Sequence, residues 1–132
     1  KIFELGKAVQ FGNGVDGTVF ATGVMVAEAL KAQKILETEN INIRVIDMIS
    51  VKPIDEEIIV KCAIETDKLV SIEDHSIIGG IGTAISEVLI EKYPIKLTRL
   101  GMKDCFGKSG KASELMKYFN LTAEAIVHEF IK

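Results

Sequence analysis

Tryptophan is absent from this sequence of 132 residues, aromatic residues make up 6%, and cysteine and proline each occur twice. Two cysteines without a pairing pattern exclude a disulfide scaffold and indicate a reduced, cytoplasmic protein. No apolar run approaches the roughly 20 residues of a membrane-spanning helix, and the N-terminus lacks a signal-peptide pattern. No cluster of basic residues accompanies the net charge of −3, so nucleic acid is not an expected partner. The sequence begins without Met, and we expect it to be a piece of a longer protein.

Apolar residues are abundant: hydrophobic residues make up 48% of the chain and charged residues 27%. This balance is typical of a globular protein rather than a disordered one. Strands that are buried on both faces of a parallel sheet read as runs of β-branched residues. Such runs predict five strands, at residues 6–11, 18–22, 43–49, 68–73 and 95–100.

Helical periodicity separates most of these strands. Between residues 24 and 37, apolar residues recur at spacings of three and four, and charged residues lie opposite. Asp55 is the predicted N-cap of the next helix, because two glutamates follow it at the positive end of the helix dipole. A third helix begins near Ile81, a short fourth helix ends near Phe119, and Thr122 caps the last helix.

The alternation of strands and helices predicts the fold class. Single helices join the second to the fifth strand, so right-handed crossovers and a parallel arrangement are expected. The turn signals Asn13-Gly14 and Asp16-Gly17 allow only an antiparallel return between the first two strands, if those strands are neighbours. We therefore expect a three-layer α/β/α domain with a five-stranded, mostly parallel sheet whose first strand is antiparallel.

Six residues at the carboxyl end of the fourth predicted strand are the candidates for a ligand or interdomain edge: Glu73, Asp74, His75, Gly79, Gly80 and Gly82. Ligands of open parallel sheets usually bind at this end of the strands. The next helix offers N–H groups to an anion, and His75 could exchange a proton near neutral pH. In the structural alternative, the glycines let the helix pack against the sheet, while Glu73 and His75 contact a neighbouring domain. We favour this alternative, because a single histidine without a placed partner makes no catalytic site.

Other motifs carry weaker signals. Segment 101–109 lies between a strand and a helix, as a phosphate-binding P-loop would, but five residues rather than four separate its glycines. We expect an ordinary loop there. Residues 73–75 are consecutive and cannot easily converge on one ion, so no metal site is predicted. The thiols of Cys62 and Cys105 have no expected catalytic role, and His128 is expected to be solvated among charged neighbours.

Five segments, taken in order, resemble the C-terminal domain of transketolases: 3–8, 21–26, 46–55, 72–82 and 101–110. They are similar to the family's first strand, its turn into the first helix, its Lys-Pro-Ile-Asp helix start, its acidic-His-glycine loop and its Phe-Gly and Ser-Gly segment. The resemblance covers essentially the whole chain and is closest to the C-terminal half of a transketolase split into two subunits. The intact run 74–80 and the tail 106–110 favour transketolase over related thiamine-diphosphate enzymes.

The resemblance implies that residues 1–132 form a single transketolase C-terminal domain, without the N-terminal and middle domains. In the family, thiamine diphosphate and a divalent metal (Mg or Ca) sit between those two domains, with the catalytic histidines. The complete enzyme moves a two-carbon ketol unit between sugar phosphates in pentose phosphate metabolism, as a cytoplasmic homodimer. For this chain the resemblance implies no catalytic, cofactor-binding or metal-binding residue, a role in assembly, and inactivity in isolation.

Two alternatives stay open at this point. A small-ligand-binding or regulatory module would use the edge near His75 and residues 79–82 to bind a phosphorylated metabolite or a nucleotide. The same domain also occurs in 2-oxoacid dehydrogenase beta subunits, where it contacts the acyltransferase core, and in deoxyxylulose phosphate synthase. The fold alone does not decide among these functions.

Overall fold

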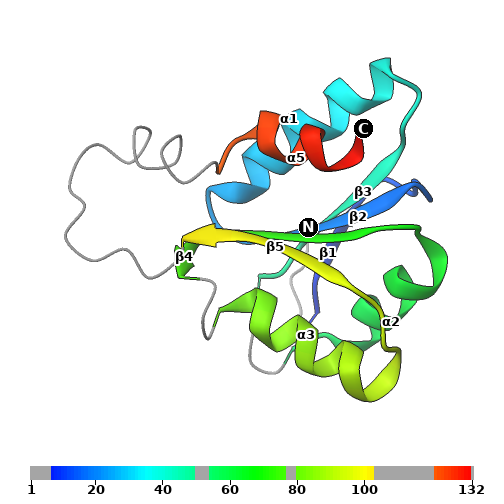
Figure 1. Ribbon diagram of the computed structural model, residues 1–132, viewed down its shortest axis with the longest axis vertical. Coiled ribbons are helices and arrows are strands. Elements are labelled where there is room, and N and C mark those ends of the chain that lie inside the picture. The colour runs from blue at the N-terminus through cyan, green and yellow to red at the C-terminus, as the bar shows by residue number, and fades with distance from the viewer. Residues whose placement is uncertain (1–6, 50–53, 77–79, 103–120, 132) are drawn as a thin grey trace.

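The computed structural model describes residues 7–49, 54–76, 80–102 and 121–131. Figure 1 shows a twisted sheet with helices on both of its faces. The elements in chain order are β1 (Val9–Phe11), β2 (Gly17–Ala21), α1 (Met25–Thr38), β3 (Ile43–Asp47), α2 (Glu56–Glu65), β4 (Leu69–Ser76), α3 (Ile81–Lys92), β5 (Leu97–Met102) and α5 (Ala123–Phe130).

The sheet has five strands in the order β1-β3-β2-β4-β5. Strands β2 to β5 are mutually parallel, and β1 pairs antiparallel with β3, with Val9 opposite Asp47. The predicted fold class is therefore confirmed. However, β1 and β2 are not neighbours, because the crossover through α1 places β3 between them. Residues 12–16 consequently span two strand spacings, about 10 Å, which an extended segment of this length reaches easily.

Several predicted boundaries agree closely with the structure, and two differ. The first strand, predicted from residue 6, begins at Val9, and the fourth strand ends later than predicted. The first helix and the second and third strands begin and end within two residues of their predicted bounds. The glycine-rich loop predicted to start at Asp74 does not start there, because β4 continues to Ser76. Pairing with β5 extends to Ser76 opposite Met102, across a register shift after Ile72. Pairing with a neighbouring strand thus overrides the low strand propensity of this polar run.

The two faces of the sheet carry separate hydrophobic cores. Side chains that alternate along each strand point to opposite faces, so each strand contributes to both cores. On one face, α1 and α5 cover Val19, Val45 and Ile72 with residues such as Leu36 and Ile126. The opposite face packs against α2 and α3, and its fully buried side chains include Phe20, Ile46, Ile59, Ile85 and Leu89.

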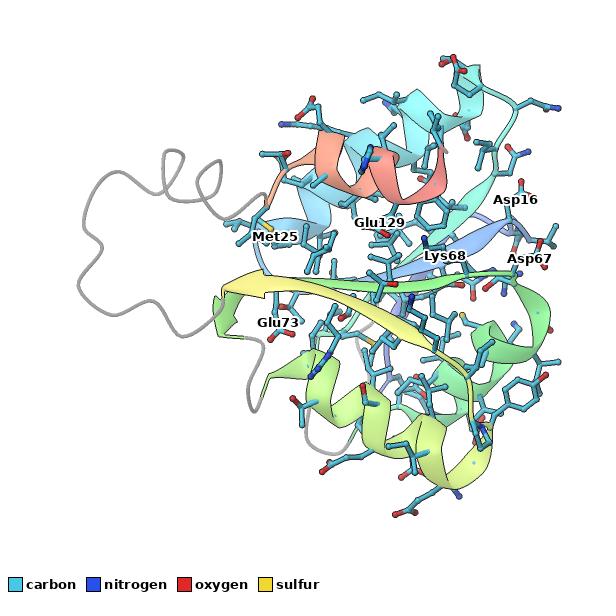
Figure 2. The ribbon with its side chains drawn as sticks, viewed as in Figure 1. Asp16, Met25, Asp67, Lys68, Glu73 and Glu129 are labelled. Carbon is cyan, nitrogen blue, oxygen red and sulfur yellow. The ribbon has the colours of Figure 1, made fainter. Side chains whose placement is uncertain are left out.

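Helix α5 is held at both ends by side chains from earlier elements. Thr122 is its N-cap, as predicted, and accepts from the backbone N–H of Ala125 at 3.3 Å. The Glu28 carboxylate of α1 accepts from the Ala123 N–H at 2.9 Å. At the other end, the Lys68 ammonium donates to the backbone oxygen of Glu129 at 2.7 Å and pairs with its carboxylate at 3.1 Å; both residues are labelled in Figure 2. Helix α5 is therefore docked by polar contacts as well as by its apolar face.

Candidate functional site

The carboxyl ends of the parallel strands meet at one edge of the sheet, which we call the carboxyl edge. It contains the ends of β2, β3, β4 and β5 and the starts of α1, α2 and α3. Strand β1 runs the opposite way, so the chain enters the sheet at this same edge, where Val9 faces Asp47. The predicted candidate segment, the start of α3 and the start of β1 therefore share one end of the sheet.

Glu73 is the best-defined candidate residue at the carboxyl edge. Its side chain extends from β4 on the α3 side of the sheet (Figure 2), and only 1% of the residue is exposed. Its Oε1 accepts from the Ile81 N–H at 3.0 Å and its Oε2 accepts from the Gly82 N–H at 2.9 Å. The residue before α3 is Gly80, which has no capping side chain, so Glu73 supplies the cap from the neighbouring strand.

The carboxylate of Glu73 occupies the position that an anionic ligand would take. A helix start binds anions through its first free N–H groups and through the positive end of its dipole. Here the first two of those groups in α3 already bind a negative charge that belongs to the chain itself. The N–H groups that the sequence offered to a phosphate are thus occupied, and Glu73 is engaged inside the domain.

Close packing around the first turn of α3 explains why residue 82 is a glycine. A Cβ atom added at this position would lie 3.0 Å from the Ser71 Oγ and 2.9 Å from the Arg99 Cδ. The lack of a side chain therefore lets the first turn of α3 approach β4 closely. Ser71 is fully buried, and its small side chain fits the same close approach.

The remaining candidates are described less completely. The backbone of Asp74 and His75 belongs to β4, and Gly80 directly precedes α3. Gly79 lies outside the described residues. Among the residues that the structure does describe, no group of three His, Cys, Asp or Glu side chains could hold a metal ion. The structure brings Glu73, Gly80 and Gly82 together as one strand-to-helix junction.

The thiol of Cys62 lies in a polar cluster near the opposite end of the sheet. The residue is fully buried, and burial raises the pKa of the thiol, against smaller opposing effects of Thr18 and Arg44. A neutral, buried thiol is a poor nucleophile, so Cys62 is a structural residue. Cys105 and residues 103–109 of the P-loop-like segment lie outside the described residues. His128 is exposed, as predicted.

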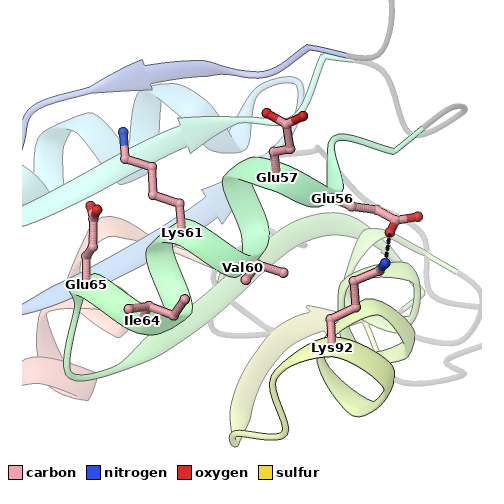
Figure 3. A pocket seen from close by; sticks show the side chains of 7 residues that line it. All are labelled: Glu56, Glu57, Val60, Lys61, Ile64, Glu65 and Lys92. Carbon is pink, nitrogen blue, oxygen red and sulfur yellow. Dashed lines mark ion pairs between the residues drawn. The ribbon is translucent and has the colours of Figure 1, made fainter.

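A groove of about 660 Å³ follows the outer face of α2 (Figure 3). Its walls combine Val60 and Ile64 with charged side chains of both signs, and Lys92 pairs with Glu56 at 3.5 Å across one end. Its lining residues differ from the six candidates of the carboxyl edge. Because the charges in the groove largely compensate one another, we assign no ligand to it. Within the described ranges, the helices are too short or too polar to span a membrane.

Glu73 was the residue whose role the sequence least revealed. A capping residue normally stands at the helix start or within the preceding residues, where local patterns find it. Glu73 lies eight residues before Ile81, and this separation along the chain conceals the relation. The available signal was an acidic residue after the mostly apolar run 69–72, before a glycine-rich segment without a polar N-cap.

Comparison with known proteins gives consistent matches. The family described as "Transketolase, C-terminal domain" matches residues 6–126. A putative transketolase C-terminal section from Methanocaldococcus jannaschii is 46% identical over 131 residues, covering 98% of this chain and 40% of that protein. A 6-deoxy-6-sulfo-D-fructose transketolase subunit from a Clostridium species is 45% identical over 125 residues, covering 95% of this chain and 39% of that protein. This chain thus spans about two fifths of these relatives.

Solved structures and a second enzyme class complete the comparison. A split-gene transketolase, described as an inactive beta4 tetramer, superposes with a TM-score of 0.90 at 45% identity, covering 96% of this chain and 41% of that one. A 1-deoxy-D-xylulose-5-phosphate synthase from Caldanaerobacter subterraneus is 36% identical over 98% of this chain and 21% of its own length. It represents one of the expected alternatives, at lower identity than the transketolase sections. The chain belongs to the transketolase C-terminal domain family.

Proposed function

We propose that this chain is a noncatalytic domain that supports the assembly of a transketolase, a transferase of two-carbon ketol units between sugar phosphates. The observation that carries this proposal is the match of the transketolase C-terminal domain family to residues 6–126. The Glu73 contact with the start of α3 supports the noncatalytic role. Ligands of parallel sheets usually bind at the carboxyl edge. Here the first N–H groups of α3 at that edge already bind the Glu73 carboxylate. A module that recognises a phosphorylated ligand would leave these N–H groups accessible.

Thiamine diphosphate and a divalent metal (Mg or Ca) belong, in this proposal, to the N-terminal and middle parts of the enzyme. When bound there, the cofactor would hold the two-carbon unit as a carbanion. The described part of this chain does not fit either group. It offers no cluster of metal ligands, and its best-placed helix start already binds Glu73. No step of ketol transfer is therefore assigned to a residue of this chain, and we expect the isolated chain to be inactive.

The proposed partner is the remainder of the same enzyme, as linked domains or as a separate subunit in a cytoplasmic homodimer. Nucleic acid and membranes are not proposed partners. Relatives named as a C-terminal section and as a subunit, each more than twice as long as this chain, support such an association. The domain would stabilise the dimer by packing rather than by chemistry.

The carboxyl edge is the surface that we propose for this contact. Val24 follows the end of β2 and is 58% exposed, and Ile49 follows the end of β3 and is 47% exposed. Large apolar side chains that are exposed close together often mark interaction surfaces. The predicted candidates Asp74 and His75 belong to the last residues of β4 at the same edge, and we include them in the proposed surface.

Charge placed on this edge is expected to weaken assembly. Val24→Asp should lower the affinity between this chain and the cofactor-binding part at least tenfold, because a carboxylate would be desolvated in the contact. The stability of the domain should hardly change, since an acidic residue is favourable at the start of α1. Calorimetric titration of the two parts measures the affinity.

Val15→Asp is the matched control for this experiment. Val15 is also 58% exposed, but it precedes β2 and so lies at the opposite end of the sheet. Its substitution should change the affinity less than twofold. If the two variants weaken assembly equally, or if neither does, the carboxyl edge is not the contact surface.

A further inference from the structure

Strand β1, through which the chain enters the sheet, is a very short edge strand. It has three residues, all of them partly exposed, and lies at the edge of the sheet with β3 as its partner. Three residue pairs, from Val9 opposite Asp47 to Phe11 opposite Val45, make up its ladder. So short an edge strand has few backbone hydrogen bonds to hold it, and side chains from other elements add to them.

Those side chains act at both ends of β1. At its last residue, Gln33 of α1 donates through Nε2 to the backbone oxygen of Phe11 at 3.0 Å, and also to that of Ile43 at 3.0 Å. Before its first residue, Asp55 accepts through Oδ2 from the Ala8 N–H at 2.9 Å. The second contact lies at the carboxyl edge, where the chain enters the sheet.

Asp55 uses its two carboxylate oxygens for two different elements. Oδ1 accepts from the Ile58 N–H at 3.3 Å and so caps α2, while Oδ2 holds Ala8. The residue is 8% exposed, which shields both contacts from water. Capping a helix needs one oxygen, and serine or asparagine serves as well. The bond to Ala8 is therefore a separate function of this side chain.

We propose that Asp55 is a positioning residue that fixes the direction in which the chain joins this domain to the rest of the enzyme. The inference rests on the proposed function, because it takes the segment before Ala8 as the connection to the preceding part. Asp55 ties that connection to α2, an element that packs against the sheet and against α3. The preceding part is thereby oriented by the body of the domain and not by a three-residue edge strand alone.

Asp55→Asn and Asp55→Ser separate the two functions of this side chain. Asparagine keeps an oxygen for the cap but turns an amide group, itself a donor, toward the Ala8 N–H. Serine keeps a capping hydroxyl and removes the second oxygen. Thr122→Ser, a substitution of the N-cap of α5, is the control for a general effect of changing a cap.

Trypsin reports on the contact directly in the full-length protein. The peptide bond after Lys7 contains the Ala8 N–H that Asp55 binds, and Lys7 is exposed. A protease needs this backbone free of its intramolecular contact. We expect both Asp55 variants to be cleaved after Lys7 about tenfold faster than the wild-type protein and Thr122→Ser, with unchanged cleavage after Lys61 in α2.

Small-angle scattering of the same full-length variants tests the orientation itself. Loss of a fixed direction should increase the radius of gyration and smooth the scattering profile, while the domain stays folded. Unchanged cleavage after Lys7 would overturn the proposal, as would faster cleavage with an unchanged profile or equal acceleration after Lys61. None of these measurements needs ketol transfer. A failure of the proposed function would appear as absent assembly, whereas a failure of this proposal would appear in the cleavage or scattering results.

Discussion

Glu73→Ala is expected to lower the free energy of unfolding by about 3 kcal/mol. The substitution leaves the N–H groups of Ile81 and Gly82 without their acceptor in a site where water has little access. Each unsatisfied buried group costs about 1–3 kcal/mol, and the removed side chain also leaves unfilled space. Glu73→Gln should cost less, because its amide oxygen still accepts one of the two bonds. Urea denaturation of the isolated variants measures both values.

Glu73→Ala should also acquire an anion site that the wild-type domain lacks. Sulfate or phosphate can enter the vacated position and bind the freed N–H groups, so millimolar concentrations should restore part of the lost stability. Glu57→Ala removes an exposed glutamate near the start of α2 and is the control, with a change within about 0.5 kcal/mol. Two results would contradict this account. One is a Glu73→Ala protein that is as stable as the Glu57→Ala control, and the other is sulfate stabilising Glu73→Ala no more than it stabilises the wild-type protein.

Gly17→Ala is expected to destabilise the domain by about 2–3 kcal/mol, because a Cβ atom at this position has no room. It would overlap Cε1 of Phe130 and lie 2.9 Å from its Cζ and 3.1 Å from the backbone oxygen of Lys68. The Phe130 ring also lies below the Lys68 ammonium, 5.9 Å from it. The methyl group would therefore push the end of α5 away from the sheet. Thermal or urea unfolding gives the loss.

A double-mutant cycle with Phe130→Ala isolates this contact. Phe130→Ala alone should cost about 2 kcal/mol, since the ring is partly buried against the core under α1 and α5. In that background Gly17→Ala should cost less than about 1 kcal/mol, because the atoms that it would strike are gone. If the two losses simply add, the close approach of α5 at Gly17 is not what excludes a side chain there.

The features that the sequence predicted correctly depend on neighbours along the chain. Asp55 and Thr122 were identified as N-caps because a capping residue bonds to the backbone three residues later, at Ile58 and Ala125. The parallel order of β2 to β5 followed from single helices between consecutive strands. In each case the periodicity, the cap or the crossover is encoded within a short segment.

The features that could not be predicted join segments distant in sequence. The insertion of β3 between β1 and β2 depends on which strand edge is free when the crossover returns. The extension of β4 to Ser76 depends on a partner, Met102, 26 residues later. Glu73 showed its role only when α3 was placed over β4. The same holds for the second oxygen of Asp55, whose partner Ala8 lies 47 residues earlier.

Ketol transfer by the purified chain tests the central claim most directly. The chain would be supplied with thiamine diphosphate, Mg²⁺, a ketose phosphate and an aldose phosphate, first alone and then with increasing amounts of the cofactor-binding part. We predict no turnover by the chain alone, and turnover that rises with the added part until the two are equimolar. Turnover by the chain alone, in proportion to its concentration, would contradict the claim that this domain is noncatalytic. Full turnover by the cofactor-binding part in its absence would contradict the claim that this domain supports assembly.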